Sequence, residues 1–151
     1  MRVYRLGTLQ HPVWDGAGAA LHGGRWNPPG SLVIYAAGSL ALAMLERLVQ
    51  RRSLRDTLVV KGVIPDDIRW ADLLEAPPTG WRSLGSPEAV AAGEAWLREG
   101  RTALLRVPSA LVPGEPNWMI NVRHPDAKRI DVSAPERLEW DPRLFGIPAP
   151  P

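Results

Sequence analysis

Residues 32–49 read Leu-Val-Ile-Tyr-Ala-Ala-Gly-Ser-Leu-Ala-Leu-Ala-Met-Leu-Glu-Arg-Leu-Val and carry the clearest structural pattern in the chain. The apolar run 32–35 predicts a buried strand, and Gly38 marks its end. Ser39 is a suitable N-cap for a helix that should run from Leu40 to about Arg52. The near-continuous apolar stretch 32–45 is too short to span a bilayer, which takes about 20 residues.

Weaker patterns flank this strand and helix on both sides. Ser86, followed by Pro87, predicts the start of a second helix that should reach about Arg98 and stop at Gly100. Residues 16–30 contain five glycines and are expected to form a loop, and a short helical turn is expected near 71–75. Further strands are predicted at 3–6, 58–64, 102–107, 117–122 and 129–132, with 137–140 as an additional candidate. Two clear helices are too few for a doubly wound sheet, so we expect a mixed α+β fold with largely antiparallel sheets.

Length and composition favour a single folded domain. The chain has 151 residues, 45% of them hydrophobic, and no cysteine. At about 100–200 residues per domain, residues 1–151 form one domain, with a core over about 3–145 and a proline-rich tail at 146–151. The missing cysteines exclude disulfides, cysteine-ligated metals and a cysteine nucleophile. The N-terminus lacks an apolar signal segment, so we expect a soluble cytoplasmic protein without membrane contact.

The charge balance argues against a general nucleic-acid-binding surface. Lysine and arginine number 18 against 16 acidic residues, a net charge of only +2, and non-specific binding to DNA depends on many phosphate contacts. One local basic run exists, formed by Arg47, Arg51, Arg52 and Arg55. It is read either as a solvated helix face or as a partner surface, and no direct DNA binding by this chain alone is expected.

Glu46 stands out because it interrupts an apolar helix. A helix that is apolar all round is mostly buried, and a carboxylate among Leu42, Leu45 and Val49 would need a polar partner. The alternative is that Glu46 lies on a narrow solvent-exposed stripe and pairs with a neighbour on its own helix.

Two other stretches contain candidate functional residues. Gly23-Gly24-Arg25-Trp26-Asn27 places an arginine fork, suited to phosphate, on a loop whose glycines permit close backbone approach. Ser109 lies between prolines after a strand, but without Gly-x-Ser-x-Gly a hydrolase nucleophile is unsupported. Three histidines at 11, 22 and 124 match no zinc motif, and no metal is expected.

In order along the chain, these stretches resemble the RES domain family, named for an arginine, a glutamate and a serine. The matching stretches are 23–27, 33–37 leading into 43–46, 106–111, and 117–121 with His124-Pro125. The resemblance runs from about Val3 to Phe145. One departure lies at Val122, where the family pattern has a proline.

The resemblance implies the toxin of a bacterial toxin–antitoxin pair, with a fold similar to diphtheria-type ADP-ribosyltransferases. It implies NAD+ as substrate and an Xre-like antitoxin that blocks the active site. By the same resemblance, Arg25, Glu46 and Ser109 carry the three named roles, and Tyr35 fills an aromatic position.

Cleavage of the nicotinamide–ribose bond builds positive charge on the ribose, which a fixed carboxylate such as Glu46 can stabilise. Arg25 would hold the pyrophosphate, and Tyr35 would stack on the nicotinamide ring. The remaining binding candidates are Gly24, Ser109 and Asn121. Water, phosphate or a protein side chain could accept the ADP-ribose; we favour degradation of NAD+ over protein modification. A non-catalytic nucleic-acid or partner-binding module is the alternative of another class.

Overall fold

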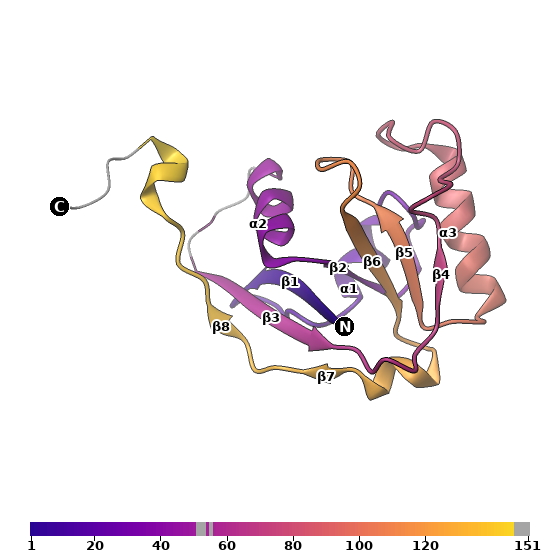
Figure 1. Cartoon of the computed structure of the whole chain (residues 1–151), viewed down its shortest axis with the longest axis horizontal. Coiled ribbons are helices and arrows are strands. Elements are labelled where there is room, and N and C mark those ends of the chain that lie inside the picture. The colour runs from indigo at the N-terminus through magenta and orange to yellow at the C-terminus, as the bar shows by residue number, and fades with distance from the viewer. Residues whose placement is uncertain (51–53, 55, 147–151) are drawn as a thin grey trace.

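The computed structural model describes residues 1–50, 54 and 56–146 (Figure 1). In this part of the chain the strands are β1 (Arg2–Thr8), β2 (Val33–Ala37), β3 (Thr57–Val63), β4 (Trp70–Asp72), β5 (Leu104–Pro108), β6 (Pro116–Asn121), β7 (Asp131–Val132) and β8 (Glu136–Arg137). The α-helices are α1 (Ala17–His22), α2 (Leu40–Val49) and α3 (Pro87–Glu99), and η1 (Pro125–Arg129) and η2 (Pro142–Phe145) are short 3-10 helices.

The described strands form one sheet in the order β4-β5-β6-β2-β1-β3-β7, and β8 also pairs with β3. Only the β4–β5 pair is parallel among these pairs, and all the others are antiparallel. The mixed, largely antiparallel α+β fold expected from the sequence is therefore confirmed.

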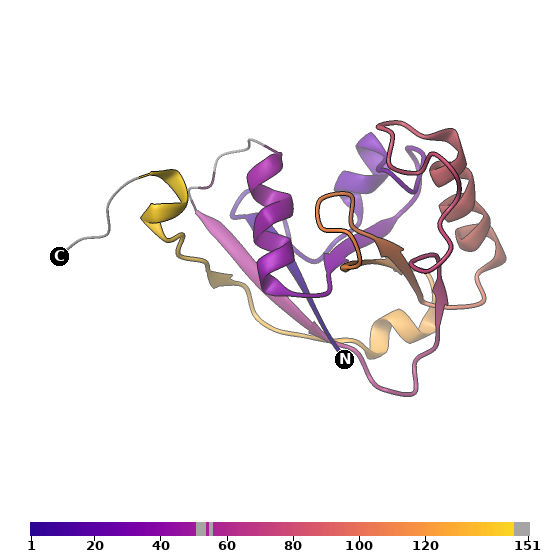
Figure 2. The same ribbon diagram turned by 45° about the horizontal axis from the view of Figure 1, so that its top comes forward.

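The sheet is nearly divided between β2 and β1. These strands pair at a single position, Tyr4 with Ala37, whereas β2 pairs with β6 over five positions and β1 with β3 over seven. The Nη1 of Arg5 donates a hydrogen bond to the Tyr35 carbonyl oxygen at 2.9 Å and adds a second link between β1 and β2. Helix α2 leaves the sheet at the same point (Figures 1 and 2).

Alternate residues of β2 pack into two separate cores, as the strand period of two requires. Ile34 and Ala36 face a cluster that includes Trp118 and Ile120 of β6. Val33 faces the opposite cluster, which α1 and α3 cover and which contains Trp26. The strand expected at 32–35 is thus a central one, buried on both faces.

Both helix starts expected from the sequence are confirmed. The Ser39 hydroxyl accepts a hydrogen bond from the Leu42 N–H at 3.2 Å, and the Ser86 hydroxyl accepts one from the Ala89 N–H at 3.2 Å. Helix α3 ends at Gly100 in the left-handed conformation (φ 59°), which glycine adopts at little cost.

Two local expectations are wrong. Residues 16–30 were expected to form only a loop, but they contain α1, which is held by packing of Ala19 rather than by a side-chain cap. Residues 70–72 form β4 instead of the start of a helical turn, because the segment pairs with β5 and the Asp72 carboxylate bonds Arg106. Tertiary contacts override weak local preference in both segments.

Helix α2 is less buried than its composition predicts. Leu45 is 43% and Val49 60% exposed, while Leu42 and Arg47 are buried. The helix packs mainly on β1 and β2, and Leu45 and Val49 remain partly uncovered within the described chain. The helix ends at Val49, and Arg51, Arg52 and Arg55 of the basic run lie outside the described residues. Burial of Arg47 removes it from any solvated basic face.

Candidate active site

Glu46 projects from α2 toward the loop between β5 and β6. Figures 1 and 2 show this helix beside that loop. Gly38 lets the start of α2 lie close to Pro116. Its N–H donates to the Pro116 carbonyl oxygen at 3.0 Å, and a Cβ at Gly38 would lie 2.9 Å from the Pro116 ring. The start of α2 is therefore tied directly to the start of β6.

Two side chains from this neighbouring region hold one oxygen of the Glu46 carboxylate. The Ser109 hydroxyl donates to Oε1 at 3.0 Å, and the Asn117 Nδ2 donates to the same atom at 2.7 Å. Within the described residues Oε2 accepts no hydrogen bond. Glu46 thus has the polar partners that its position demanded, and they come from the turn after β5 and from β6 rather than from its own helix.

Ser109 is fully buried, and its hydroxyl is used within the protein. The oxygen accepts hydrogen bonds from the N–H groups of Leu111 and Val112 at 3.1 and 3.2 Å, and its hydrogen goes to Glu46. A hydroxyl has one hydrogen and two lone pairs. Ser109 therefore shapes the turn after β5 and orients the carboxylate at the same time.

Asn117 is the site residue that sequence reasoning missed. It begins the stretch 117–121, which carried part of the family resemblance, and the only further signal is a polar amide at the start of an apolar strand. Its role depends on pairing with Glu46, 71 residues away in sequence.

Tyr35 organises the glycine-rich loop before β2. Its hydroxyl donates to the Asn27 Oδ1 at 2.6 Å and accepts from the Trp26 N–H at 3.2 Å. A Cβ at Gly24 would lie 2.7 Å from this hydroxyl, so the close approach requires glycine. Burial raises the pKa of the Tyr35 phenol well above its usual range, against the opposing effects of the Trp26 N–H and the Arg25 charge. The phenol therefore stays neutral and can donate.

Arg25 connects this loop to the segment after β4. Its Nη1 donates to the carbonyl oxygens of Trp81, Arg82 and Ser83 at 3.0, 2.7 and 3.1 Å. Trp26 stacks on Trp81 with ring centroids 5.8 Å apart. Trp26 is therefore a core residue, and it is Trp81 that faces the nearby hollow. Within the described chain the Nε and Nη2 of Arg25 make no hydrogen bond.

A hollow of about 310 Å³ is lined by residues that contact Arg25 and Glu46. Trp81 and Arg82, held by Arg25, line one part of it, and Ser109, bonded to Glu46, lines another. Asp72 supports the remaining wall: its bond to Arg106 fixes the strand that leads into Leu74 and Glu75 and lowers the pKa of the carboxyl. The hollow has the size of a small-molecule site.

The structure thus brings Arg25, Gly24 and Tyr35 together in one group and Glu46 with Ser109 in another, and of these five residues Ser109 alone lines the hollow. Asn121 is not among them. It lies at the opposite end of β6 from Asn117, about 14 Å along the strand, and its Oδ1 accepts from the Arg123 N–H at 3.1 Å.

The described residues show no group of three or more His, Asp or Glu side chains that could hold a metal ion. In the same residues, no helix is long and apolar enough to cross a membrane. The chemistry available at the site is that of a fixed carboxylate, a guanidinium, a phenol and backbone groups around an open hollow.

Comparisons with known proteins agree on one group of relatives. The sequence model of the family described as "RES domain" matches residues 2–141. The "Prs ADP-ribosylating toxin" of Sphingobium sp. (strain YBL2) is 39% identical over 145 residues, which cover 91% of this chain and 90% of that protein. A "Toxin Res" of Yersinia enterocolitica is 36% identical over 152 residues, covering 95% and 99% of the two chains.

Among solved structures, a chain of the M. tuberculosis MbcT–MbcA toxin–antitoxin complex is similar with a TM-score of 0.73. The match covers 96% of this chain and 86% of that chain at 22% identity. At this identity the likeness establishes the fold.

Proposed function

Because the chain belongs to the RES domain family, we propose that it is the toxin of a bacterial toxin–antitoxin pair and that it cleaves the nicotinamide–ribose bond of NAD+. Two relatives that match nearly their whole length are named toxins, and one is named for ADP-ribosylation. Both NAD+ degradation and ADP-ribosylation begin by breaking this bond.

The observation that carries the proposal is the asymmetric setting of the Glu46 carboxylate. One oxygen is fixed by Ser109 and Asn117, and the other accepts no hydrogen bond in the described structure. When the bond to nicotinamide breaks, its electron pair leaves with the neutral ring and the ribose becomes oxocarbenium-like. A carboxylate already held in place stabilises that charge, or a ribose hydroxyl, without reorganising.

In this proposal Ser109 and Asn117 act through Glu46. Both donate to Oε1, so they fix the rotamer of the carboxylate and leave Oε2 without a hydrogen bond in the described chain. The sequence suggested that Ser109 binds a phosphate or ribose hydroxyl. Its buried and fully used hydroxyl favours positioning instead.

Arg25 has two tasks in the proposed site. Its Nη1 already anchors residues 81–83 at the edge of the hollow. Its Nε and Nη2 are left to pair with the pyrophosphate of NAD+, for which a guanidinium fork is well suited. Gly24 allows the close approach of the loop backbone to the Tyr35 hydroxyl, and Tyr35 fixes the loop through that hydroxyl. In this proposal the part of the Tyr35 ring that does not pack on the Trp26 cluster stacks on the nicotinamide.

The acceptor of the ADP-ribose distinguishes two candidate reactions. Water or phosphate as acceptor makes the protein an NAD+-degrading enzyme, which we favour for one compact domain. Transfer to a cellular protein is the second candidate, and the name of the 39% identical relative favours it.

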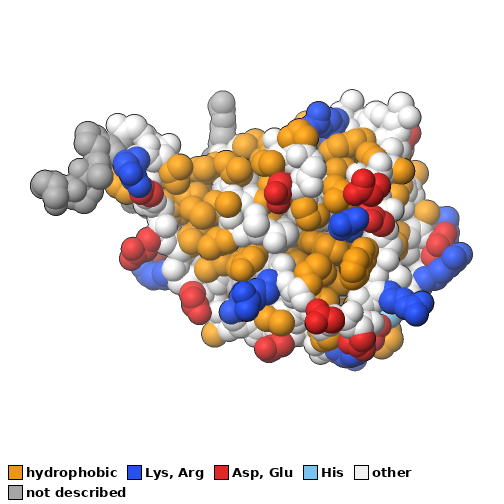
Figure 3. Space-filling view, in the orientation of Figure 1, with side chains coloured by type: hydrophobic (Ala, Val, Ile, Leu, Met, Phe, Trp, Pro, Cys, Tyr) orange, Lys and Arg blue, Asp and Glu red, His pale blue; other side chains and the backbone are white. Residues whose placement is uncertain are grey.

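An antitoxin partner fits the surface beside Glu46. Figure 3 shows hydrophobic side chains spread across the face that carries α2. Leu45 and Val49 of α2 and Leu111 of the β5–β6 loop are exposed at 43%, 60% and 37%. Exposed apolar surface of this kind marks interaction sites, so we propose that an Xre-like antitoxin covers it and blocks the site.

Controlled expression in a bacterial host, with NAD+ measured by mass spectrometry, tests the proposal. The wild-type chain should arrest growth and deplete NAD+, whereas Glu46→Gln should do neither while retaining its fold. Glu94→Gln, an exposed control on α3, should behave as wild type. Full toxicity of Glu46→Gln would refute the enzyme and favour a non-catalytic binding module.

Purified protein separates the two reactions. Incubation with NAD+, with and without phosphate, should release free ADP-ribose or its phosphorylated form together with nicotinamide. An unchanged NAD+ pool with a labelled protein band in cell extract would instead establish protein ADP-ribosylation.

A further inference from the structure

A second hollow lies at the opposite end of β6 from Glu46. Its volume is about 370 Å³, within the range of small-molecule sites. Residues from four segments line it: the loop before β2, the end of α3, the end of β6, and the turn into η1. They are Gly30, Ser31, Leu32, Leu97, Gly100, Asn121, Arg123, His124 and Pro125. Of the binding candidates suggested by the sequence, Asn121 alone lines this hollow, and none of the residues given a role in the proposed NAD+ cleavage does.

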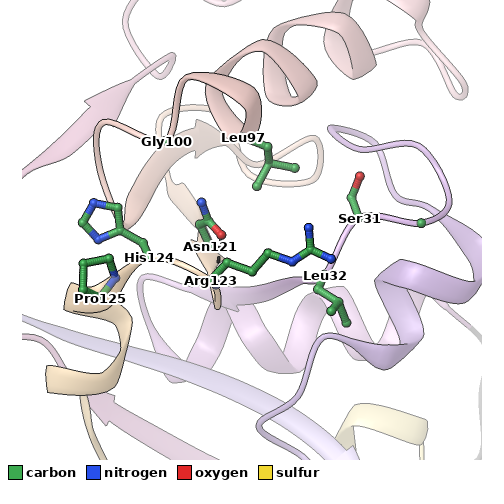
Figure 4. Close-up of a pocket in the computed structure, with 9 residues that line it drawn as sticks. Ser31, Leu32, Leu97, Gly100, Asn121, Arg123, His124 and Pro125 are labelled. Carbon is green, nitrogen blue, oxygen red and sulfur yellow. Dashed lines mark hydrogen bonds between the residues drawn. The ribbon is translucent and has the colours of Figure 1, made fainter.

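A buried amide faces this hollow with its donor group unused. Asn121 is only 7% exposed, and its Oδ1 accepts the Arg123 N–H at 3.1 Å. Within the described residues its Nδ2 donates no hydrogen bond, and Figure 4 shows this nitrogen directed toward Leu97. This nitrogen is not among the described buried polar atoms that lack a partner, so it is accessible from the hollow that Asn121 lines and can donate to an acceptor bound there.

Two further donors border the same space. Figure 4 shows Arg123 extending its guanidinium toward Leu32 and Ser31, and within the described chain this group forms no ion pair. The His124 Nδ1 accepts the Asp126 N–H at 3.2 Å, which leaves the hydrogen of a neutral ring on Nε2.

The lining residues include a cation and no acid. The Asp126 carboxylate lies beside the lining His124, with its Oδ2 3.9 Å from Nδ1, and its Oδ1 accepts a hydrogen bond from Arg129 at 3.2 Å. Leu32, Leu97 and Pro125 add apolar surface to the same hollow, with Leu32 beside Arg123 and Pro125 beside His124 (Figure 4). Donors together with apolar surface suit a ligand with an anionic group and a small apolar body.

We propose that this second hollow binds a small organic anion, whose oxygens accept hydrogen bonds from Asn121 Nδ2 and Arg123 and whose apolar part packs on Leu97. The site is separate from the Glu46 site, and its existence does not depend on NAD+ cleavage. A phosphate or a carboxylate could supply the anionic oxygens.

Nuclear magnetic resonance of the full chain gives a direct readout through the side-chain NH2 of Asn121. The probes are phenyl phosphate, benzoate and inorganic phosphate, which separate the two anionic groups and the contribution of the apolar body. Phenyl phosphate or benzoate should shift the Asn121 NH2 resonances saturably, with Kd about 1 mM or below. Inorganic phosphate should bind at least tenfold more weakly.

Three variants locate the binding. Asn121→Asp keeps the acceptor for the Arg123 N–H but replaces the donor by an anion, and Arg123→Ala removes the guanidinium. Each variant should lower the affinity for the organic probe at least tenfold. Because Asn121→Asp has no side-chain NH2 group, its titration is followed at the backbone N–H of Arg123. Lys128→Ala, an exposed cation of the neighbouring η1, should leave affinity unchanged, as should Glu46→Gln.

The outcomes are decisive in both directions. No saturable shift with either organic probe, or binding that survives both Asn121→Asp and Arg123→Ala, overturns the proposal. An equal loss of affinity in Lys128→Ala would show that binding depends on general positive charge, and it would overturn the proposal as well. Loss of binding in Glu46→Gln would place the probe in the NAD+ site instead.

Discussion

Replacing Tyr35 by phenylalanine removes the hydroxyl and keeps the ring, so it separates the effect of the two hydrogen bonds from that of ring packing. The hydroxyl donates to the Asn27 Oδ1 at 2.6 Å and accepts from the Trp26 N–H at 3.2 Å. Asn27 is 1% and Trp26 2% exposed, so neither polar group gains full access to water in exchange. The phenylalanine ring would retain the apolar packing of the tyrosine.

The two hydrogen bonds give the expected magnitude. Each buried group left without its partner costs about 1–3 kcal/mol, so Tyr35→Phe should lower the free energy of unfolding by about 2–6 kcal/mol. For a domain of this size that corresponds to a fall in Tm of about 6–19 °C. NAD+ turnover should also fall, because the loop that carries Arg25 loses its anchor.

Urea unfolding followed by tryptophan fluorescence, together with an NAD+ consumption assay, measures both effects. Tyr4→Phe is the matched control, since the Tyr4 hydroxyl makes no hydrogen bond in the described chain, and it should change stability by less than about 0.5 kcal/mol. Equal stability of the two variants would refute the anchoring role. Full NAD+ turnover by a destabilised Tyr35→Phe would assign the catalytic contribution to the ring alone.

Three further predictions follow from the same geometry. Gly93→Ala should destabilise by about 1–3 kcal/mol or more, because its methyl would meet a backbone carbonyl oxygen of the Arg25 loop at 1.8 Å, whereas Gly18→Ala, with nothing within 4 Å, should be neutral or stabilising in thermal unfolding. Ser109→Ala should reduce kcat for NAD+ cleavage more than it raises KM, because it frees the Glu46 carboxylate; an unchanged kcat would exclude positioning. Burial raises the pKa of Tyr35 in the folded protein, so the neutral phenol contributes its full stability at neutral pH. This contribution should be lost as pH rises above about 10, the pKa of tyrosine in the unfolded chain. The free energy of unfolding of Tyr35→Phe should therefore fall less at alkaline pH than that of the wild type.

The elements predicted from local sequence patterns are confirmed where the pattern is strong. The strand at β2, the Ser39 cap of α2 and the Ser86-to-Gly100 limits of α3 follow from hydrophobic period and capping, which act between near neighbours. The expectations failed for α1 and β4, which are short and depend on packing and pairing with distant segments.

For the candidate site, the sequence suggests individual residues but not the hydrogen bonds that connect them. Arg25, Tyr35, Glu46 and Ser109 were singled out by local irregularity and by the family resemblance. Asn117 was missed, and Asn121 was placed with the others although it lines a different hollow.

The sequence by itself determined the class of fold, the presence of one unusual carboxylate in an apolar helix, and the family. Only the tertiary structure decided what holds that carboxylate, since its partners Ser109 and Asn117 are 63 and 71 residues away. It also decided that the outer side of α2 is exposed. The physical reason is that strand and helix patterns reflect short-range geometry, whereas hydrogen bonds between side chains depend on which strands become neighbours in the sheet.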